Sequence, residues 1–276
     1  MNNSILIAGL CITGAIVAAA GISAFLIAPE RASKEKRAVF SKRNYAHRGL
    51  HEADKNPPEN SLPAFAAAAE LGYGVELDVH ITRDGELAVF HDDDLKRACG
   101  LERVIEDLSW DELKELKLFG TQFGIPPLSQ VLEIMGENCP VIIELKRGSR
   151  NTELCEKTYQ TMKKYGGKYC VESFDPRIVA WFRHNAPEVL RGQLANEPKE
   201  MMKDTSKINA FAVGNLLTNC LARPNFVAYG LGRKPLLVRL CEKMGAMKVA
   251  WVAHDGSIEK NNDAVIFEFY KPSVKY

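Results

Sequence analysis

The chain has 276 residues, 46% of them hydrophobic and 26% charged, with a formal net charge of +1, a composition typical of a globular protein of one or two domains. Six basic residues are concentrated in residues 31–43, so the remainder is net negative, which argues against an extended nucleic-acid-binding face. The seven cysteines are scattered without a CxxC pair, which argues against a disulfide-stabilised secreted domain and indicates a reducing compartment.

A long apolar run opens the chain, because residues 5–28 (ILIAGLCITGAIVAAAGISAFLIA) contain no charged side chain. As a helix this run reaches about 36 Å, which exceeds the ~30 Å hydrocarbon core of a bilayer. The residues before it carry no basic side chain, whereas a cleaved signal peptide has a basic start and a shorter apolar stretch. We therefore expect residues 1–30 to form a membrane anchor with one N-terminal transmembrane helix.

The basic segment 31–43 follows the apolar run directly and holds six basic residues against one acidic residue. We interpret this segment as a juxtamembrane linker. Positive charge next to a transmembrane helix favours the cytoplasmic side. We therefore expect a single-pass membrane protein whose domain of residues 44–276 faces the cytoplasm.

From residue 44 onward, short apolar strands alternate with helical stretches, which is typical of a mainly parallel sheet. At this length the alternation predicts an α/β fold, a closed (β/α)8 TIM barrel. Residues 93–124 are long for a connection between a strand and a helix, so they are predicted to form a small inserted subdomain. The candidate strands exceed eight, so one or two are expected outside the barrel. They are 45–46, 74–80, 86–91, 141–145, 169–174, 189–194, 210–213, 226–229, 248–252 and 264–267.

Two carboxylates stand inside one of these apolar strands, residues 75–79 (VELDV). Side chains alternate along a strand with a period of two, so Glu76 and Asp78 share one face and the three apolar residues share the other. The apolar face would pack against the helices, so both carboxylates would point into the barrel. Because the active sites of TIM barrels lie at the carboxyl ends of the strands, this position suits a functional site.

The same placement recurs at the ends of two further strands, where Glu144, Lys146 and His91 stand. Three converging carboxylates would repel each other without a cation, and oxygen donors favour Ca²⁺ or Mg²⁺ over zinc. Lysine binds phosphate as a point charge, Arg48 offers a planar fork for it, and His47 and His91 can exchange protons near neutral pH. Each feature alone would also fit an ordinary polar strand face or a hydrogen-bonded core histidine. Together they predict metal-assisted phosphate ester chemistry.

The motifs that carry these residues occur between residues 45 and 146, in the order AHRG, PENS, ELDVHITRDGELAVFHDDDLKR, IPPLSQVL and ELK. In this order and spacing the chain resembles the glycerophosphodiester phosphodiesterase family. The resemblance implies a TIM barrel with a small insertion after the HD motif. It also implies hydrolysis of a small-molecule glycerophosphodiester to glycerol 3-phosphate and an alcohol, with a divalent metal, commonly Ca²⁺ or Mg²⁺, as cofactor.

The resemblance further implies roles for eight residues of this chain. Trp251 matches a late aromatic residue that lines the glycerol pocket, and a buried core tryptophan is the alternative interpretation. The implied roles are acid–base catalysis for His47 and His91, metal ligation for Glu76, Asp78 and Glu144, and substrate binding for Arg48, Lys146 and Trp251.

The match weakens toward the C-terminus, where the late strands shape the pocket for the alcohol. Trp251 is followed by Val-Ala-His where the family has Trp-Thr and then asparagine, and the last strand ends in Phe267-Glu268 where the family has Thr-Asp. These departures leave three further hypotheses open. They are a membrane-anchored lysophospholipase D acting on lysophospholipids, a metal-free phosphatidylinositol phospholipase C, which the three carboxylates disfavour, and a non-catalytic membrane-bound sensor with the same fold.

Overall fold

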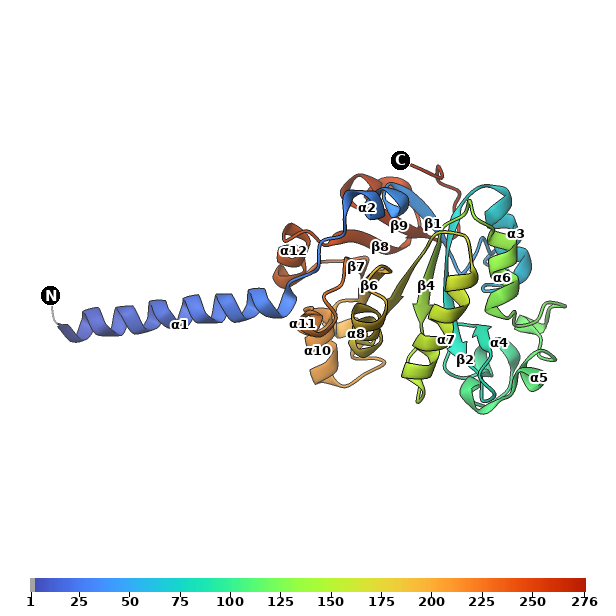
Figure 1. Cartoon of the computed structure of the whole chain (residues 1–276), viewed down its shortest axis with the longest axis horizontal. Helices are drawn as coiled ribbons and strands as arrows, with labels where there is room; N and C mark the ends of the chain where they lie inside the picture. The colour runs from blue at the N-terminus through green and yellow to red at the C-terminus, as the bar shows by residue number, and fades with distance from the viewer. Residues whose placement is uncertain (1–2) are drawn as a thin grey trace.

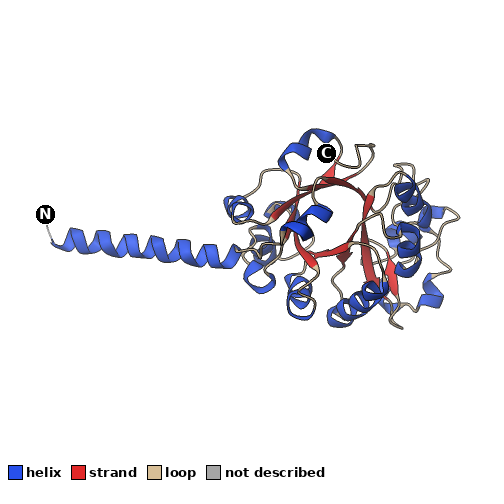
Figure 2. Cartoon of the chain, turned by 45° about the horizontal axis from the view of Figure 1, so that its top comes forward, coloured by secondary structure: helices blue, strands red, loops and turns tan. Residues whose placement is uncertain are grey.

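The computed structural model describes residues 3–276, with side chains described from residue 13 onward. Its body is a closed barrel of eight parallel strands, which Figure 2 shows as a ring surrounded by helices. Each strand pairs with its neighbour in parallel, and pairing between the first and second strands closes the ring. The barrel strands are β1 (Arg43–His47), β2 (Gly74–Ile81), β4 (Val141–Leu145), β5 (Tyr169–Ser173), β6 (Leu190–Ala195), β7 (Phe226–Gly230), β8 (Met247–Ala253) and β9 (Ala264–Phe267).

The predicted (β/α)8 barrel is therefore confirmed, and the excess of strand candidates has two explanations. β3 (Leu87–Val89) pairs antiparallel with β2 and lies outside the barrel. The predicted strand 210–213 is wrong, because those residues lie inside the helix α10 (Lys207–Gly214). The side chain of Ser206 caps that helix by accepting a hydrogen bond from the backbone N–H of Asn209 at 3.3 Å. The periodicity of a short apolar run does not show whether it forms a strand or a buried helix turn. Ser206, as a helix N-cap, was the sequence signal that indicated a helix here.

The main core fills the space between the outer face of the sheet and the surrounding helices. Leu77 of β2 points outward into this core and is fully buried beside apolar side chains of the helices. Phe182 of α8 packs into the same core from the helical layer. The helices that cover the barrel are α3 (Leu62–Glu70), α6 (Leu128–Met135), α7 (Asn151–Lys164), α8 (Pro176–Asn185) and α12 (Leu236–Lys243), with short α9 (Pro198–Met201) and α11 (Asn219–Ala222) flanking α10.

Leu77→Ala is expected to lower the free energy of unfolding by about 2–5 kcal/mol, because it removes buried methyl groups and leaves a cavity in this core. Urea unfolding followed by circular dichroism measures the change. The matched control is Leu71→Ala, whose side chain is exposed and whose loss should cost no more than about 0.5 kcal/mol. Equal destabilisation by the two variants would contradict this packing.

Residues 93–124 lie beyond β3 and carry short helices with an apolar cluster of their own. Leu95, Ile105, Leu113 and Leu118 are buried in that cluster. The helices are α4 (Lys96–Cys99), η1 (Ile105–Asp107), α5 (Trp110–Leu113) and η2 (Leu118–Gly120). This packing holds the segment against the carboxyl end of β3, beside the strand ends of the barrel.

The opposite end of the barrel is closed by helix α2 (Lys34–Phe40), which precedes β1. Phe40 is buried in the barrel interior together with Tyr45 and Phe226, and its backbone carbonyl accepts a hydrogen bond from the Tyr45 hydroxyl at 3.1 Å. The carboxyl ends of the strands therefore form the open end of the barrel, where a ligand can enter.

Helix α1 (Asn3–Ile27) projects from the side of the barrel, as Figure 1 shows. In the part of the chain with described side chains, no helix combines the length and apolar character that crossing a membrane requires. This finding does not support the predicted transmembrane helix, of which residues 1–12 lie outside the described side chains. The anchor, the linker and their orientation stay predictions.

Candidate active site

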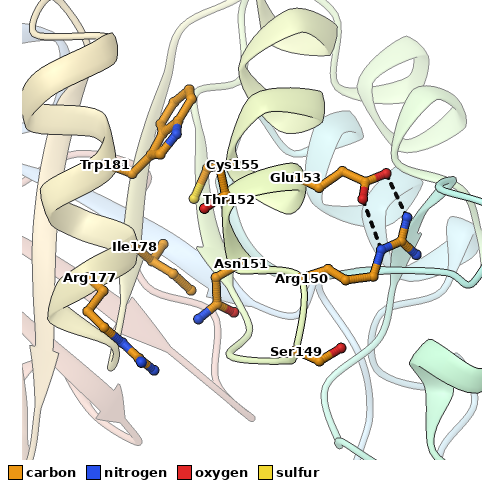
Figure 3. A pocket seen from close by; sticks show the side chains of 9 residues that line it. All are labelled: Ser149, Arg150, Asn151, Thr152, Glu153, Cys155, Arg177, Ile178 and Trp181. Atoms are coloured by element: carbon orange, nitrogen blue, oxygen red, sulfur yellow. Dashed lines mark hydrogen bonds and ion pairs between the residues drawn. The ribbon is translucent and has the colours of Figure 1, made fainter.

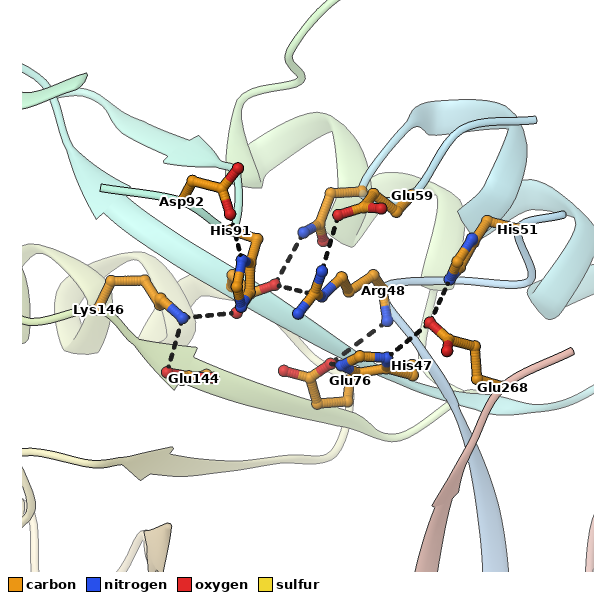
Figure 4. A network of polar contacts seen from close by, with 12 residues as sticks. His47, Arg48, His51, Glu59, Glu76, His91, Asp92, Glu144, Lys146 and Glu268 are labelled. Carbon is orange, nitrogen blue, oxygen red and sulfur yellow. Dashed lines mark hydrogen bonds and ion pairs between the residues drawn. The ribbon is translucent and has the colours of Figure 1, made fainter. Parts of the chain in front are cut away.

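The candidate active site is a row of polar side chains that strand register places side by side. His47 of β1 pairs in register with Glu76 of β2, and Asp78 of β2 pairs with Glu144 of β4. Glu144 is in turn the register partner of Glu172 on β5. Residues that are far apart in the sequence therefore meet at the open end of the barrel (Figure 4).

Glu76, Asp78 and Glu144 form a cluster that could hold a metal ion. One ligand oxygen from each lies within 4.8 Å of the others, and all three residues are buried. Burial raises the pKa of Glu76 well above its ordinary value of 4.5, and repulsion from the other two carboxylates adds to the effect. Buried oxygen donors that repel one another are the arrangement that a hard divalent cation stabilises.

Glu172 is a fourth buried carboxylate, to which the sequence analysis assigned no role. Its Oε2 atom is buried and has no hydrogen-bond partner among the described residues. Burial raises the pKa of Glu172 well above 4.5, with a further contribution from Glu144 and Asp78. Its position near the end of the apolar strand β5 could have indicated a site residue, because the other three carboxylates occupy the same kind of position.

Two cations face these carboxylates. Lys146 Nζ lies 3.3 Å from Asp78 Oδ1 and 3.0 Å from Glu144 Oε1, and Arg48 Nε lies 3.4 Å from Asp78 Oδ2. Although burial opposes it, the attraction of Glu144 and Asp78 raises the pKa of Lys146, so the lysine stays charged. Four carboxylates and two cations leave an excess of negative charge that one divalent cation would neutralise, so the donor set fits such an ion.

The His47 ring contacts the carboxylate of Glu268, which directly follows the last strand, β9. Its Nδ1 lies 3.1 Å from Glu268 Oε1, and its Nε2 faces Glu76 Oε2 at 3.9 Å. Burial lowers the pKa of His47 to about 4, against a smaller opposing effect of the hydrogen bond with Glu268. The ring is therefore neutral near pH 7 and able to accept a proton.

Glu268 also binds a second buried histidine, His51, whose Nε2 lies 3.0 Å from the same Oε1 atom. Although burial opposes it, the hydrogen bonds from His47 and His51 hold the pKa of Glu268 well below 4.5. The sequence analysis noted Glu268 only as a departure from the family pattern and did not consider His51. Neither role was visible in the sequence, because the contact joins residues more than 200 positions apart.

His91 stands on the other side of the carboxylate cluster, after β3. Its Nδ1 lies 2.6 Å from Asp92 Oδ1, and Asp92 Oδ2 accepts a hydrogen bond from Arg97 Nε at 2.6 Å. Although burial opposes it, these two hydrogen bonds lower the pKa of Asp92 to about 2. The ionised Asp92 carboxylate therefore holds the His91 ring in one orientation.

Arg97 of the inserted segment connects this histidine to the first loop of the barrel. Its Nη2 donates a hydrogen bond to Glu59 Oε1 at 2.7 Å, and Arg48 Nη1 donates to the same oxygen at 2.7 Å. Asn60 Nδ2 donates to Asp78 Oδ2 at 2.8 Å. The PENS motif therefore supports Arg48 and Asp78, as Figure 4 shows for Arg48 and Glu59.

A cavity of about 1220 Å³ opens beside the site and reaches across to α10 and α11. His91, Glu144 and Lys146 line one part of it, and the rest of the lining mixes apolar side chains such as Phe174 and Val213 with charged ones such as Arg177 and Asp204. This volume is above the range of most small-molecule sites. A ligand bound at Lys146 could therefore extend well beyond a phosphate and a glycerol.

Trp251, a predicted substrate-binding residue, is not among the side chains that line this cavity. Its indole N–H donates a hydrogen bond to the Ala228 carbonyl at 3.1 Å, and its ring packs edge-on against Phe174 at 5.7 Å. His47, Arg48, Glu76 and Asp78 do not line this cavity either, so the substrate-binding role of Trp251 stays a prediction.

A second cavity, of about 430 Å³, lies between α7 and α8 on the side of the barrel (Figure 3). Arg150 and Glu153 form an ion pair at 2.6 Å there, and Cys155 and Trp181 complete its wall. None of the predicted site residues lines this cavity. We therefore place the active site at the larger cavity.

Glu268→Gln is expected to lower kcat by at least ~10-fold, because a neutral amide holds and polarises His47 less well than a carboxylate. Glu268 raises the pKa of His47, so its removal should also move the acid limb of the pH–rate profile to lower pH. Steady-state kinetics from well below the pKa of His47 up to pH 8 test this, with Glu268→Asp as the charge-conserving variant expected to keep the limb near its original position. A reduced rate with an unmoved acid limb in Glu268→Gln would contradict the positioning role.

Comparison with known proteins gives a consistent result. The model of the "Glycerophosphoryl diester phosphodiesterase family" matches residues 47–260. A glycerophosphodiester phosphodiesterase of Caldanaerobacter subterraneus is 31% identical over 221 residues, 75% of this chain and 83% of that protein. Lysophospholipase D GDPD1 of Rattus norvegicus is 33% identical over 159 residues, 52% of this chain and 49% of that protein.

Solved structures show the same fold. A glycerophosphodiester phosphodiesterase of Thermotoga maritima has a TM-score of 0.60 at 27% identity, covering 81% of this chain and 93% of that one. An Oleispira antarctica phosphodiesterase, solved in complex with the product sn-glycerol-3-phosphate, has a TM-score of 0.65 at 21% identity, covering 84% and 94%. The family match begins at His47 and includes the row of carboxylates, although Glu268 lies beyond it. The chain therefore belongs to the glycerophosphoryl diester phosphodiesterase family and is a phosphodiesterase.

Proposed function

We propose that the chain hydrolyses a glycerophosphodiester to glycerol 3-phosphate and an alcohol, with His47 and His91 as the acid–base pair. The observation that carries this proposal is the strand register that sets His47 beside Glu76 and brings Asp78 to Glu144. His91, which follows β3, lies at the same carboxylate cluster (Figure 4), and each histidine has its own carboxylate partner. Such a pair can transfer protons on both sides of a phosphorus centre bound between them.

Glu76, Asp78 and Glu144 would hold the divalent cation, and their all-oxygen donor set favours Ca²⁺ or Mg²⁺. When bound, such a cation supplies charge neutralisation at the phosphate and polarises its oxygens. Lys146 and Arg48 are the two cations near this cluster and would bind the remaining phosphate oxygens.

In this proposal His47 accepts a proton from the nucleophile, either water or a hydroxyl of the substrate's own glycerol. The lowered pKa of His47 supports this assignment, because a neutral ring is the form that accepts a proton. His91 donates a proton to the leaving alkoxide, and its hydrogen bond with Asp92 orients the ring for this step. Glu268 and Asp92 position the two rings.

The experiment is a substrate panel on the purified full chain with Ca²⁺, Mg²⁺ or Mn²⁺ present. Glycerophosphocholine and glycerophosphoglycerol should yield glycerol 3-phosphate together with choline or glycerol, one water being consumed for each bond broken. No release of glycerol 3-phosphate from any member of the panel, together with measurable binding of those diesters, would replace this proposal with the sensor hypothesis.

A lysophospholipase D activity is a second candidate, and the size of the cavity favours it. The lining beyond Lys146 includes the apolar side chains of Phe174, Met201 and Val213, which could contact an acyl chain that glycerophosphocholine lacks. The rat relative named above carries lysophospholipase D in its name. Lysophosphatidylcholine would then yield lysophosphatidic acid and choline, and faster turnover of lysophosphatidylcholine than of glycerophosphocholine would establish this candidate over the first.

We also propose that residues 5–28 anchor the chain in a membrane, with the barrel on the cytoplasmic side. The uncharged run and the basic segment after it support this arrangement. The side chains of Ile16, Val17, Ile22 and Phe25 on α1 are apolar and exposed, as a lipid-contacting helix requires. Resistance of the barrel to protease added outside intact cells would support this orientation, and its digestion there would overturn it.

A further inference from the structure

Large apolar side chains are exposed on three helices of the barrel's outer layer, of which α11 and α12 lie on either side of the base of α1 (Figure 1). On α10, Ile208 and Phe211 lie one turn apart and are 81% and 57% exposed. Leu236 and Leu240 lie one turn apart on α12 and are also exposed. Leu221 on α11 is half exposed and lines the large cavity as well. We call these five residues the α10–α12 face.

The α10–α12 face adjoins the base of α1, whose end packs against α11 and α12 (Figure 1). The Arg223 guanidinium stacks on the Phe25 ring at 4.6 Å and donates hydrogen bonds to the carbonyl oxygens of Phe25 and Ala28. Glu30 pairs with the fully buried Arg191 at 2.7 Å. These contacts fix the end of α1, including the exposed Phe25, beside α11 and α12.

The segment that carries the α10–α12 face is strongly basic. Residues 198–245 contain eight lysines and arginines against three acidic residues, whereas the whole chain has a net charge of +1. Two of the three acidic residues are already neutralised locally, in the pairs Glu200–Lys203 and Glu242–Lys234. Lys207 and Arg239 are exposed beside the apolar side chains of α10 and α12.

We propose that the α10–α12 face docks on an anionic lipid surface. Helices with exposed aliphatic and aromatic side chains beside lysine and arginine are typical of the bilayer interface, where apolar side chains enter the acyl boundary and basic ones contact anionic headgroups. A nucleic acid would contact the basic residues without burying Ile208 or Phe211, and the core of a protein interface is depleted in charge. The docking does not require α1 to cross the bilayer.

Docking in this way would also place the active-site cavity at the lipid surface. Leu221 belongs both to the α10–α12 face and to the cavity lining, and Met201 and Val213 continue the lining toward the catalytic end. A diester with an apolar tail could pass from the bilayer into the cavity along this edge. This last step rests on the proposed function, whereas the docking itself does not.

The test places a tryptophan on the full chain and measures its quenching by vesicles that contain brominated phosphatidylcholine, which quenches only a ring in contact with lipid. Phe211→Trp is the probe variant, and Leu71→Trp is the control, because Leu71 is also exposed, at 49%, but lies at the end of α3. In vesicles that also contain phosphatidylglycerol, the added quenching should be at least ~2-fold larger for Phe211→Trp than for Leu71→Trp. Charge reversal by Lys207→Glu with Arg239→Glu should reduce that excess.

Equal quenching of the two variants would overturn the proposal, even if the whole chain binds vesicles through α1. Sedimentation velocity in detergent provides the other decisive outcome. If the wild-type chain sediments as a dimer and Ile208→Asp as a monomer, the face is an interface between copies and the proposal is wrong. Hydrolysis of soluble glycerophosphocholine by both tryptophan variants is measured in parallel, so a failure of the proposed activity is recognised separately from a failure of docking.

Discussion

His47→Ala and His91→Ala are each expected to lower the hydrolysis of a glycerophosphodiester by about 10²- to 10⁴-fold, the usual contribution of a positioned acid or base. Both rings flank the carboxylate cluster, and each has its own carboxylate partner at 3.1 Å or less. When either ring is removed, water must carry out one of the two proton transfers in its place. Neither ring belongs to the cluster of Glu76, Asp78 and Glu144, so the affinity for a divalent cation should be retained.

Stopped assays of glycerophosphocholine hydrolysis and titration calorimetry with Ca²⁺ or Mg²⁺ measure the two properties on the same preparations. His184→Ala is the control, because His184 lies exposed on α8 away from the site. Near-wild-type turnover in either of the first two variants would contradict the acid–base assignment. Loss of turnover together with loss of cation binding would indicate instead that the histidine maintains the cluster.

Glu76→Gln is expected to abolish cation-dependent turnover and, in the absence of the cation, to stabilise the fold. A divalent cation contributes several kcal/mol to the transition state, so turnover should fall by at least ~10³-fold. The stabilisation follows because burial and repulsion from Asp78 and Glu144 raise the pKa of Glu76 well above 4.5. A carboxyl group whose pKa is raised by folding destabilises the fold progressively as the pH rises above its ordinary value of 4.5. An amide lacks this penalty.

The melting temperature of chelator-treated protein between pH 5 and 8 tests the second part of this prediction. The difference between Glu76→Gln and wild type should grow as the pH rises, and added cation should raise the melting temperature of the wild type only. Glu70→Gln, at an exposed position on α3, is the control expected to match the wild type throughout. A variant that melts below the wild type at every pH, or that still binds the cation, would contradict the account of the cluster.

The barrel and the carboxylate cluster were predictable from the sequence because both depend on local periodicity. The alternation within residues 75–79 placed Glu76 and Asp78 on the inner face, and the structure has Leu77 on the outer face in the helix-packed core. The segment 210–213 was mispredicted because four apolar residues carry no periodicity that separates a strand from a helix turn. Ser206, four positions before residue 210, caps the helix that these residues form.

The supporting residues of the site could not be predicted in the same way. Glu268 reaches His47 and His51 from a distant part of the chain, and their meeting depends on the closure of β9 against β1. Glu172 joins the cluster only through the register of β4 with β5. The packing of Trp251 against Phe174 likewise joins residues that are far apart in the sequence. Strand register and ring packing are tertiary properties that no local pattern contains.

The most direct test of the central claim is phosphorus NMR of glycerophosphocholine with the purified full chain, first in a chelator and then with Ca²⁺ or Mg²⁺ in excess. We predict no signal of glycerol 3-phosphate in the chelator and its steady appearance after the cation is added. The same experiment on Glu144→Gln should show no appearance under either condition. Glycerol 3-phosphate released at equal rates with and without the cation would contradict a carboxylate cluster that binds a catalytic metal.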